Sequence, residues 1–561
     1  EEMEPETEPI EEDEAEVDEA PPTSEDPDTA PPEEAAECQY GESPALADQG
    51  LPSVCDRLPM NPLVFDHSYI LPDGFVVDPQ IGEYGGPIVF TIGETAIFNE
   101  SLFYSINRTP IPTASNIFES FENNDDYTVW TFTIRKGLKW SDGEPVTTED
   151  VEFAIEGVTG NTDIYPTFPT WLRTGGSGEG ERVELNVVDD FTFTFTFAAP
   201  FPAFSKYVAG NWQWYSTILK PKHYLSQFHA DYADEAELNA KVEDAGFDEW
   251  FELLEQKDAP WPASEQAIGM PRLDPWLMTE YAEDRYVLER NPYYGMVDQE
   301  FNQLPYIDEI VVYPVAFSAP ETAEVMLFSG EGHYNWNLDL TKLPLYKEEE
   351  AAGGMVAYPY PNKDSRMMTL NLTYQDETYR EIVRDVRFRR ALAYAIDSEE
   401  INTELYLDTA SMPKSTPPDY DPEEANRLLD EMGMTERDGE GFRMTPDGEP
   451  FEIILTLMPE IGYSMQAPFI ADYMEEIGIN LSYKQVEGSV YWESMDANEQ
   501  MGTIVWNFAP KFESSPQYAG FLPFNTWAPL WREWYESAGE QGEQPPDWIM
   551  EAYNIWEEMS N

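Results

Sequence analysis

The chain has 561 residues, of which 41% are hydrophobic and 14% aromatic, enough for two or more domains with sizeable cores. It holds 31 basic residues against 110 acidic ones, a formal net charge of −79. Binding to nucleic acid or to an anionic membrane surface needs clustered cations, so the charge balance disfavours both kinds of partner.

The N-terminal region begins with a strongly biased segment. Residues 1–37 hold 18 acidic and no basic residues and almost no large apolar side chain, so we expect a disordered, extended acidic spacer. Residues 38–84 read as an N-terminal extension. The two cysteines, Cys38 and Cys55, flank one short loop. In an exported protein this spacing predicts a disulfide, with two free thiols as the alternative. Two thiols and four scattered histidines do not make a metal site.

The most informative segment is 128–158. Apolar side chains alternate with Thr over its first strand, at Trp130, Phe132 and Ile134. Turn residues follow, and Thr147 with Asp150 three positions later resembles a capping box that opens a helix. The segment holds no nucleophile–base pair and no ligand cluster, so the residues alone predict a small folded unit without chemistry.

Other stretches carry regular patterns further along the chain. These are a strand within 85–93, a hairpin over 183–197 with an alternating Phe face, a helix over 323–330 closed by Gly330, an amphipathic helix over 385–401 whose apolar stripe includes Ile396, a helix from Asp421 to Gly433, a β-α-β unit over 451–486, a strand over 503–506, and a final helix through Trp548, Ala552, Ile555, Trp556 and Met559.

Four segments of the chain also carry recognisable sequence motifs. They are Ile134–Thr147 followed by Asp150-Val151, the Arg-Asn-Pro-Tyr-Tyr run at 290–294, the helix of 385–401, and Tyr420–Ala425. Together they resemble the signature of family 5 of the extracellular solute-binding proteins of ABC importers, which includes oligopeptide- and dipeptide-binding proteins. The first match is long and ordered, so chance is a poor explanation for it.

The resemblance implies an α/β fold: the two-lobe clamshell of periplasmic binding proteins with an extra small middle domain. It assigns 85–110, 205–315 and 504–561 to lobe I, 111–204 to the middle domain and 316–503 to lobe II. Family members normally continue well beyond the last residue of this chain, so we expect either a shortened chain or a lobe that is closed differently.

The strand over 503–506 is where the resemblance bears on the ligand. Peptide-binding members place an Asp shortly after the Trp of this strand to hold the peptide ammonium group. Here Trp506 is followed by Asn507, Phe508 and Ala509, so the charged anchor is missing. This disfavours ordinary peptides with a free N-terminus and favours oligosaccharides, which some members bind on aromatic rings. The expected ligand-binding residues are Trp506, Asn507, Phe508, Tyr358 and Tyr360, with core packing as the alternative for each.

No catalytic residue, metal ligand or cofactor is predicted. The sequence contains no glycine-rich phosphate loop, Gly-x-Ser-x-Gly, His-Glu-x-x-His or Cys-x-x-Cys. The favoured function is capture of a peptide- or oligosaccharide-sized solute between two lobes, a closure that needs contacts made only in the closed form. The alternatives are a cell-surface scaffold or assembly protein on the same fold and, less favoured, an enzyme.

The expected partners follow from the resemblance. They are the solute, an ABC permease and its ATPase subunits, and no nucleic acid. The expected location is the outer face of the cytoplasmic membrane or the periplasm. A membrane contact would arise only through a lipid-modified Cys preceding residue 1, with 1–37 as the spacer.

Overall fold

The structure is a computed structural model. It describes residues 38–66, 69–70, 76–77, 80–93, 103–104, 114–208, 215–259, 261–358, 365–410, 419–458, 464–507 and 522–560. The predicted spacer, 1–37, lies outside the described residues. Both Cys38 and Cys55 are disulfide-bonded. The chain divides into two units, Glu1–Gln39 and Tyr40–Asn561, and the second unit contains the sheets.

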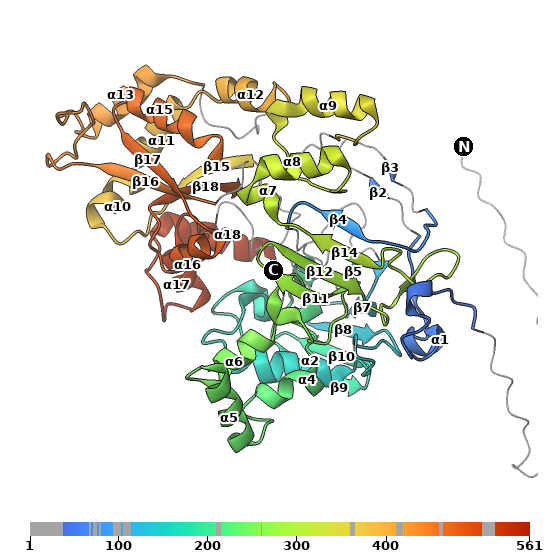
Figure 1. The fold of residues 1–561 in the computed structure, drawn as a ribbon. Coiled ribbons are helices and arrows are strands. Elements are labelled where there is room, and N and C mark those ends of the chain that lie inside the picture. Colours follow the sequence, from blue (N-terminus) through green and yellow to red (C-terminus); the bar gives the residue numbers. More distant parts are fainter. Residues whose placement is uncertain are drawn as a thin grey trace, which may run out of the picture. The chain divides into compact units, whose positions relative to one another are not determined.

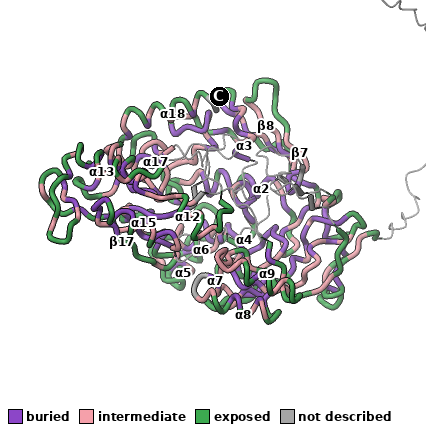
Figure 2. Tube along the Cα trace, turned by 90° about the horizontal axis from the view of Figure 1, so that it is seen from above, coloured by how far each residue is buried: buried purple, intermediate pink, exposed green. Residues whose placement is uncertain are grey.

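The first sheet has the strand order β11-β12-β14-β4, formed by β11 (Trp276–Ala282), β12 (Arg285–Arg290), β14 (Glu309–Val312) and β4 (Ile88–Phe90). β14 and β4 are parallel and the other neighbours are antiparallel. Leu288, Ile310 and Val312 of this sheet share a core with α5 (Glu235–Ala245) and α6 (Trp250–Lys257). Figure 2 shows that most of α5 is exposed. Its buried residues are Leu238 and Val242, four apart as one helix face requires.

The middle sheet is antiparallel and has the order β7-β8-β10-β9, formed by β7 (Phe118–Asn123), β8 (Val129–Ile134), β10 (Thr192–Thr196) and β9 (Glu184–Asp189). The predicted alternation is confirmed, because Trp130, Phe132 and Ile134 are buried. Phe132 stacks on Phe193 of the predicted hairpin at 5.1 Å between ring centroids. The predicted capping box is also present and opens α2 (Thr148–Glu152), which continues as a π-helix over Phe153–Thr159.

The second sheet has the order β15-β18-β16-β17, formed by β15 (Ser365–Leu370), β18 (Gly502–Asn507), β16 (Glu452–Leu457) and β17 (Asn480–Gln485). β16 runs parallel to β17 and to β18, and β15 is antiparallel to β18. The predicted β-α-β unit is therefore confirmed, with α15 (Ala467–Glu476) as its helix. Figure 1 shows α15 beside α11 (Val386–Ala395) and α13 (Pro422–Glu431), and all three contribute to the core of this sheet.

The assignment of 504–561 to lobe I differs from the structure. β18 pairs with β15 and β16 of the second sheet. The helices α17 (Pro529–Glu536) and α18 (Asp547–Ser560) bury Trp531, Ile549 and Tyr553 in the core of that sheet. The helices pack there because burying these large apolar side chains against the second sheet removes them from water. The other predicted domain boundaries stay predictions.

Two predicted helices also differ in detail. The helix expected over 385–401 ends at Ala395, because the Asp397 carboxylate accepts hydrogen bonds from the N–H groups of Glu399 and Glu400 and begins a new helix, α12 (Ser398–Tyr406). The final helix forms, but Trp548 and Ile555 are on its exposed side. Its inner face is made of Ile549, Tyr553 and Trp556, at the helical spacing of four and three.

The other helices and strands that the structure describes complete the fold. They are α1 (Val54–Arg57), β1 (Leu63–Val64), β2 (Tyr69–Ile70), β3 (Val76–Val77), β5 (Phe103–Tyr104), β6 (Ala114–Ser115), α3 (Phe204–Val208), α4 (Lys222–Leu225), β13 (Met296–Val297), α7 (Val315–Ser318), α8 (Pro320–Ser329), α9 (Leu343–Ala352), α10 (Glu377–Arg384) and α16 (Gly488–Asp496). Among the helices that the structure describes, none combines the length and the apolar character needed to cross a membrane.

The first two of the four signature motifs meet in one buried junction. Ser141 of the first motif exchanges hydrogen bonds with the Arg272 backbone, and the Arg272 guanidinium binds Asp274 at 2.6 Å. Asn291 of the second motif donates to the Asp274 carbonyl oxygen at 2.9 Å. A Cβ atom on Gly143 would lie 2.9 Å from the Tyr293 hydroxyl oxygen, so the two turns approach as closely as glycine permits. The motifs act here in packing.

Candidate functional site

The first candidate surface is the end of the second sheet at which β18 finishes. Ligands of α/β proteins bind outside the carboxyl ends of parallel strands. β16 and β18 both end here, and the register pairs Arg366 with Trp506 and Ser365 with Asn507. The backbone therefore places two of the predicted ligand-binding residues, Trp506 and Asn507, at this edge, beside the start of β15.

The other predicted residues are Tyr358, Tyr360 and Phe508. Tyr358 precedes β15 and is 54% exposed. Phe508 and Tyr360 lie outside the described residues. A ligand role for these side chains stays a prediction.

The second candidate surface is the corresponding end of the first sheet, where β4 and β14 run parallel. The segment 332–337 lies along β4 and beyond its end. His333 donates its backbone N–H to the Val89 carbonyl at 2.7 Å, and its ring Nδ1 accepts the Val89 N–H at 2.8 Å. Tyr334 bridges to Phe90, with ring centroids 4.8 Å apart. These contacts fix the direction in which 334–337 leaves the sheet.

The side chains of this segment combine aromatic surface with carboxamides. Tyr334 is 39% and Trp336 45% exposed. The Asn335 amide donates to the Thr91 hydroxyl at 3.0 Å and accepts the Asn337 backbone N–H at 2.7 Å. The Asn337 Nδ2 atom is buried, and no acceptor among the described residues binds it. The segment thus combines two partly exposed rings with an unpartnered buried donor, and no side chain from Tyr334 to Asn337 is charged.

Sequence reasoning missed this segment. Its signal is the run Gly330-Glu-Gly-His-Tyr-Asn-Trp-Asn, in which a helix-ending glycine is followed by aromatic and amide residues. That pattern indicates a loop, but only pairing with β4, more than 240 residues earlier, places it at the end of a parallel strand pair.

Gly332 holds this segment against β4. A Cβ atom built there would lie 2.5 Å from the Thr91 Cγ2 atom, closer than real Cβ contacts allow. We expect Gly332→Ala to displace 333–337 and to weaken solute binding by roughly tenfold, as small misplacements in a binding site do.

The matched control is the Gly332→Ala, Thr91→Ser double variant. The affinity of each variant is measured by calorimetry, in which the solute is titrated into the protein. Serine removes Cγ2 and keeps the hydroxyl that bonds Asn335. Affinity should return in the double variant. Equal weakening in both variants would show that contact with Thr91 is not what positions the segment.

The arrangement supports binding more than bond-breaking chemistry. Within the described ranges, no three His, Cys, Asp or Glu side chains come together as metal ligands would. The polar groups at the first-sheet edge are amides and hydroxyls, which orient a ligand through hydrogen bonds, and the rings supply contact area.

Comparison with known proteins identifies the chain's family. The family described as "Bacterial extracellular solute-binding proteins, family 5 Middle" matches residues 114–528, well over half of the chain. The chain belongs to this family. It is a substrate-binding component of the kind that ABC importers use, as the signature motifs predict.

Relatives and solved structures agree with this membership. A "Periplasmic alpha-galactoside-binding protein" of Rhizobium meliloti (strain 1021) is 25% identical over 535 residues, 85% of this chain and 72% of that protein. The oligopeptide-binding protein OppA shares 27% identity at a TM-score of 0.53, covering 93% of this chain and 86% of that one. The binding protein MelB of Agrobacterium fabrum C58, solved with stachyose, superposes at a TM-score of 0.69 with 20% identity, covering 93% of this chain and 81% of that one.

These similarities confirm the predicted fold class for this solute-binding protein, the periplasmic-binding-protein type of α/β fold. They do not bear on which side chains touch the solute.

Proposed function

We propose that this solute-binding protein captures an uncharged oligosaccharide outside the cytoplasm and delivers it to an ABC permease. The observation that carries the proposal is the segment Tyr334–Asn337, where two partly exposed rings and two carboxamides stand at the end of β4 without a charged side chain. Pyranose rings present apolar C–H faces to aromatic rings and hydroxyl groups to amides, so this set matches them in both respects.

The edge of the second sheet supports the same ligand class. Ala509 stands where peptide-binding relatives carry an Asp, so the chain lacks that partner for a peptide ammonium group. Trp506 and Asn507, with Phe508, Tyr358 and Tyr360, would supply the second wall of the site. The galactoside-binding and stachyose-bound relatives are of the proposed ligand class. OppA is the reason to test peptides beside sugars.

Location and assembly follow from the family. Relatives are periplasmic, and binding proteins of this family hand their solute to a membrane permease. We infer the same route here, with residues 1–37 as an extended spacer. The lipid anchor proposed before residue 1 would be tested by the intact mass of the native protein.

Calorimetric titration with stachyose and with a neutral tetrapeptide tests the ligand class. We expect saturable binding of stachyose, no binding of the tetrapeptide, and an affinity loss of roughly tenfold or more in Trp336→Ala, because a stacking ring is removed. Trp492→Ala is the matched control: Trp492 is 40% exposed, close to the 45% of Trp336, and belongs to α16. Tetrapeptide binding that disappears on acetylating the peptide's N-terminus would contradict the proposal.

A further inference from the structure

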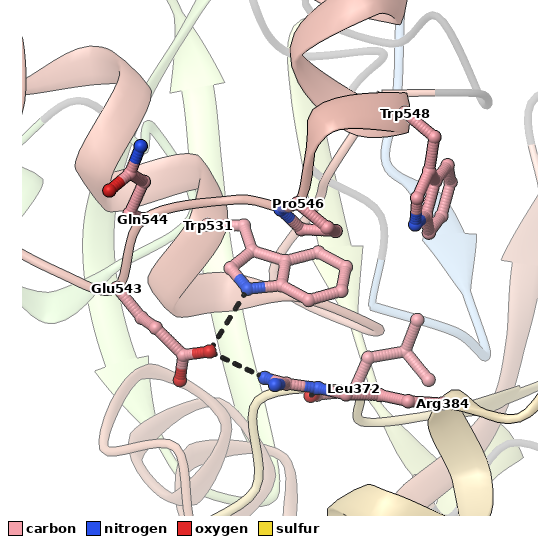
Figure 3. Close-up of a pocket in the computed structure, with 7 residues that line it drawn as sticks. All are labelled: Leu372, Arg384, Trp531, Glu543, Gln544, Pro546 and Trp548. Carbon is pink, nitrogen blue, oxygen red and sulfur yellow. Dashed lines mark hydrogen bonds and ion pairs between the residues drawn. The ribbon is translucent and has the colours of Figure 1, made fainter.

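A separate cavity of about 230 Å³ lies at the other end of β15 from the proposed solute site. Its lining includes Leu372, two residues past the end of that strand, whereas Trp506 pairs with Arg366 near the strand's start. Six residues of extended strand span roughly 20 Å, so the cavity and the second-sheet edge are distinct places. Figure 3 shows the cavity between Trp531 of α17, Trp548 of α18 and Arg384 of α10.

Two indole rings form the apolar walls of the cavity. The rings of Trp531 and Trp548 are 6.2 Å apart at an interplanar angle of 88°. Trp531 is 1% exposed and fixed in the core, whereas Trp548 is 53% exposed. A ring entering from solvent would therefore meet a rigid inner wall and an accessible outer one (Figure 3).

The polar end of the cavity pairs one carboxylate with two guanidinium groups. Arg384 binds the Glu543 carboxylate at 2.7 Å and donates from Nε to the Leu372 carbonyl at 2.6 Å. Glu543 also accepts from Arg380 at 2.9 Å and from the Trp531 indole N–H at 3.4 Å. In the part of the chain that the structure describes, no acceptor binds Arg384 NH1 and no hydrogen bond involves the Gln544 amide. These two groups are open to a ligand.

The geometry points to a second binding site here, for a single neutral sugar ring. An anion is disfavoured, because the guanidinium is already paired with Glu543 and the chain carries a net charge of −79. A cation is disfavoured, because the Arg384 guanidinium already covers the face of Trp531 at 4.9 Å. A purely apolar ligand would remove water from Arg384 NH1 and from Gln544 without replacing its hydrogen bonds.

A pyranose ring satisfies all of these constraints at once. Its C–H face packs on the Trp548 indole, and its hydroxyl oxygens accept hydrogen bonds from Arg384 and Gln544. The volume is below the 300–1,000 Å³ that is typical of drug-sized ligands. A terminal ring or a monosaccharide therefore fits, and a whole oligosaccharide does not.

Saturation-transfer NMR on the full chain, titrated with methyl α-galactopyranoside, tests this site. All variants for this test also carry Trp336→Ala, which weakens the proposed solute site, so that the observed binding reports on the cavity. We expect saturable millimolar binding that weakens roughly tenfold in Trp548→Ala. It should weaken severalfold in Gln544→Ala, which removes no hydrogen bond between described residues, and stay unchanged in Trp492→Ala.

The outcomes separate clearly. The site is supported if methyl α-galactopyranoside binding weakens in Trp548→Ala and Gln544→Ala and is retained in Trp492→Ala. If Trp548→Ala in the otherwise native chain binds stachyose as the native chain does, the two sites are independent of each other. No saturable sugar binding, or equal binding in all variants, overturns it. Binding of N-acetyltryptophanamide in place of the sugar also overturns it and assigns the cavity to an aromatic side chain of a partner protein.

Discussion

Replacing Asp274 by alanine is expected to lower the free energy of unfolding by about 3–5 kcal/mol, the usual result of breaking a buried ion pair from one side. The side chains of Arg272 and Asp274 are 2% and 0% exposed, and the pair is 2.6 Å apart. The variant removes the Asp274 carboxylate from the buried Arg272 guanidinium. It also removes the hydrogen-bond acceptor of the Tyr215 hydroxyl, which donates to the Asp274 carboxylate at 3.0 Å.

The measurement is urea denaturation followed by tryptophan fluorescence. The matched control is Glu280→Ala, which breaks the Arg285–Glu280 pair, exposed on both sides at 39% and 66%. An exposed pair contributes well under about 1 kcal/mol, so this variant should unfold almost as the native chain does. Equal losses in the two variants would mean that burial does not set the strength of the Asp274 pair.

The signature segment and the junction around Arg272 show which features the sequence could predict and which it could not. The alternation at 130–134 and the capping box at Thr147–Asp150 depend on neighbours in sequence, so period and spacing alone predicted them. The bond from Asn291 to Asp274 and the approach of Gly143 to Tyr293 join turns far apart in the chain, and no local pattern encodes them.

The end of the chain illustrates a different limit. A strand at 503–506 was predictable from its apolar run, but its sheet was not. β18 joins the second sheet through its pairing with β15, whose start lies about 140 residues earlier. Likewise, several helical registers suit the apolar residues of 547–560. Packing against the second-sheet core buries Ile549 and Tyr553, and Trp548 is left exposed.

The strongest motif and the proposed ligand-binding residues are therefore in different places. The turns of the first two signature motifs are packed against each other around Arg272. The partly exposed rings and the unpartnered Asn337 amide nitrogen follow Gly330 and Gly332 in a stretch without any motif. Family membership could therefore be predicted from the sequence, whereas half of the candidate site needed the pairing of residues 333–334 with β4.

Replacing Asp150 of the signature segment by alanine should also lower the free energy of unfolding strongly. Its side chain is buried and accepts three hydrogen bonds: from the Thr147 N–H at 3.0 Å, the Trp140 indole N–H at 3.2 Å and the Lys222 N–H at 3.0 Å. Asp150→Ala would leave these donors unpaired in the interior. At about 1–3 kcal/mol for each, the expected loss is at least roughly 3 kcal/mol of the free energy of unfolding.

A pH series on Asp150→Asn tests the electrostatic side of this contact. Burial raises the pKa of Asp150 above its ordinary value, although the three donors favour the ionised form. A carboxyl group with a raised folded-state pKa stabilises the fold fully below its unfolded pKa of about 3.9, and this contribution is lost as the pH rises through the folded pKa. The stability advantage of the native chain over Asp150→Asn should therefore shrink as the pH is raised from about 4 toward neutrality. If the advantage grows with pH instead, the three donors outweigh burial, and Asp150 is held as a stabilised carboxylate at the centre of the signature turn.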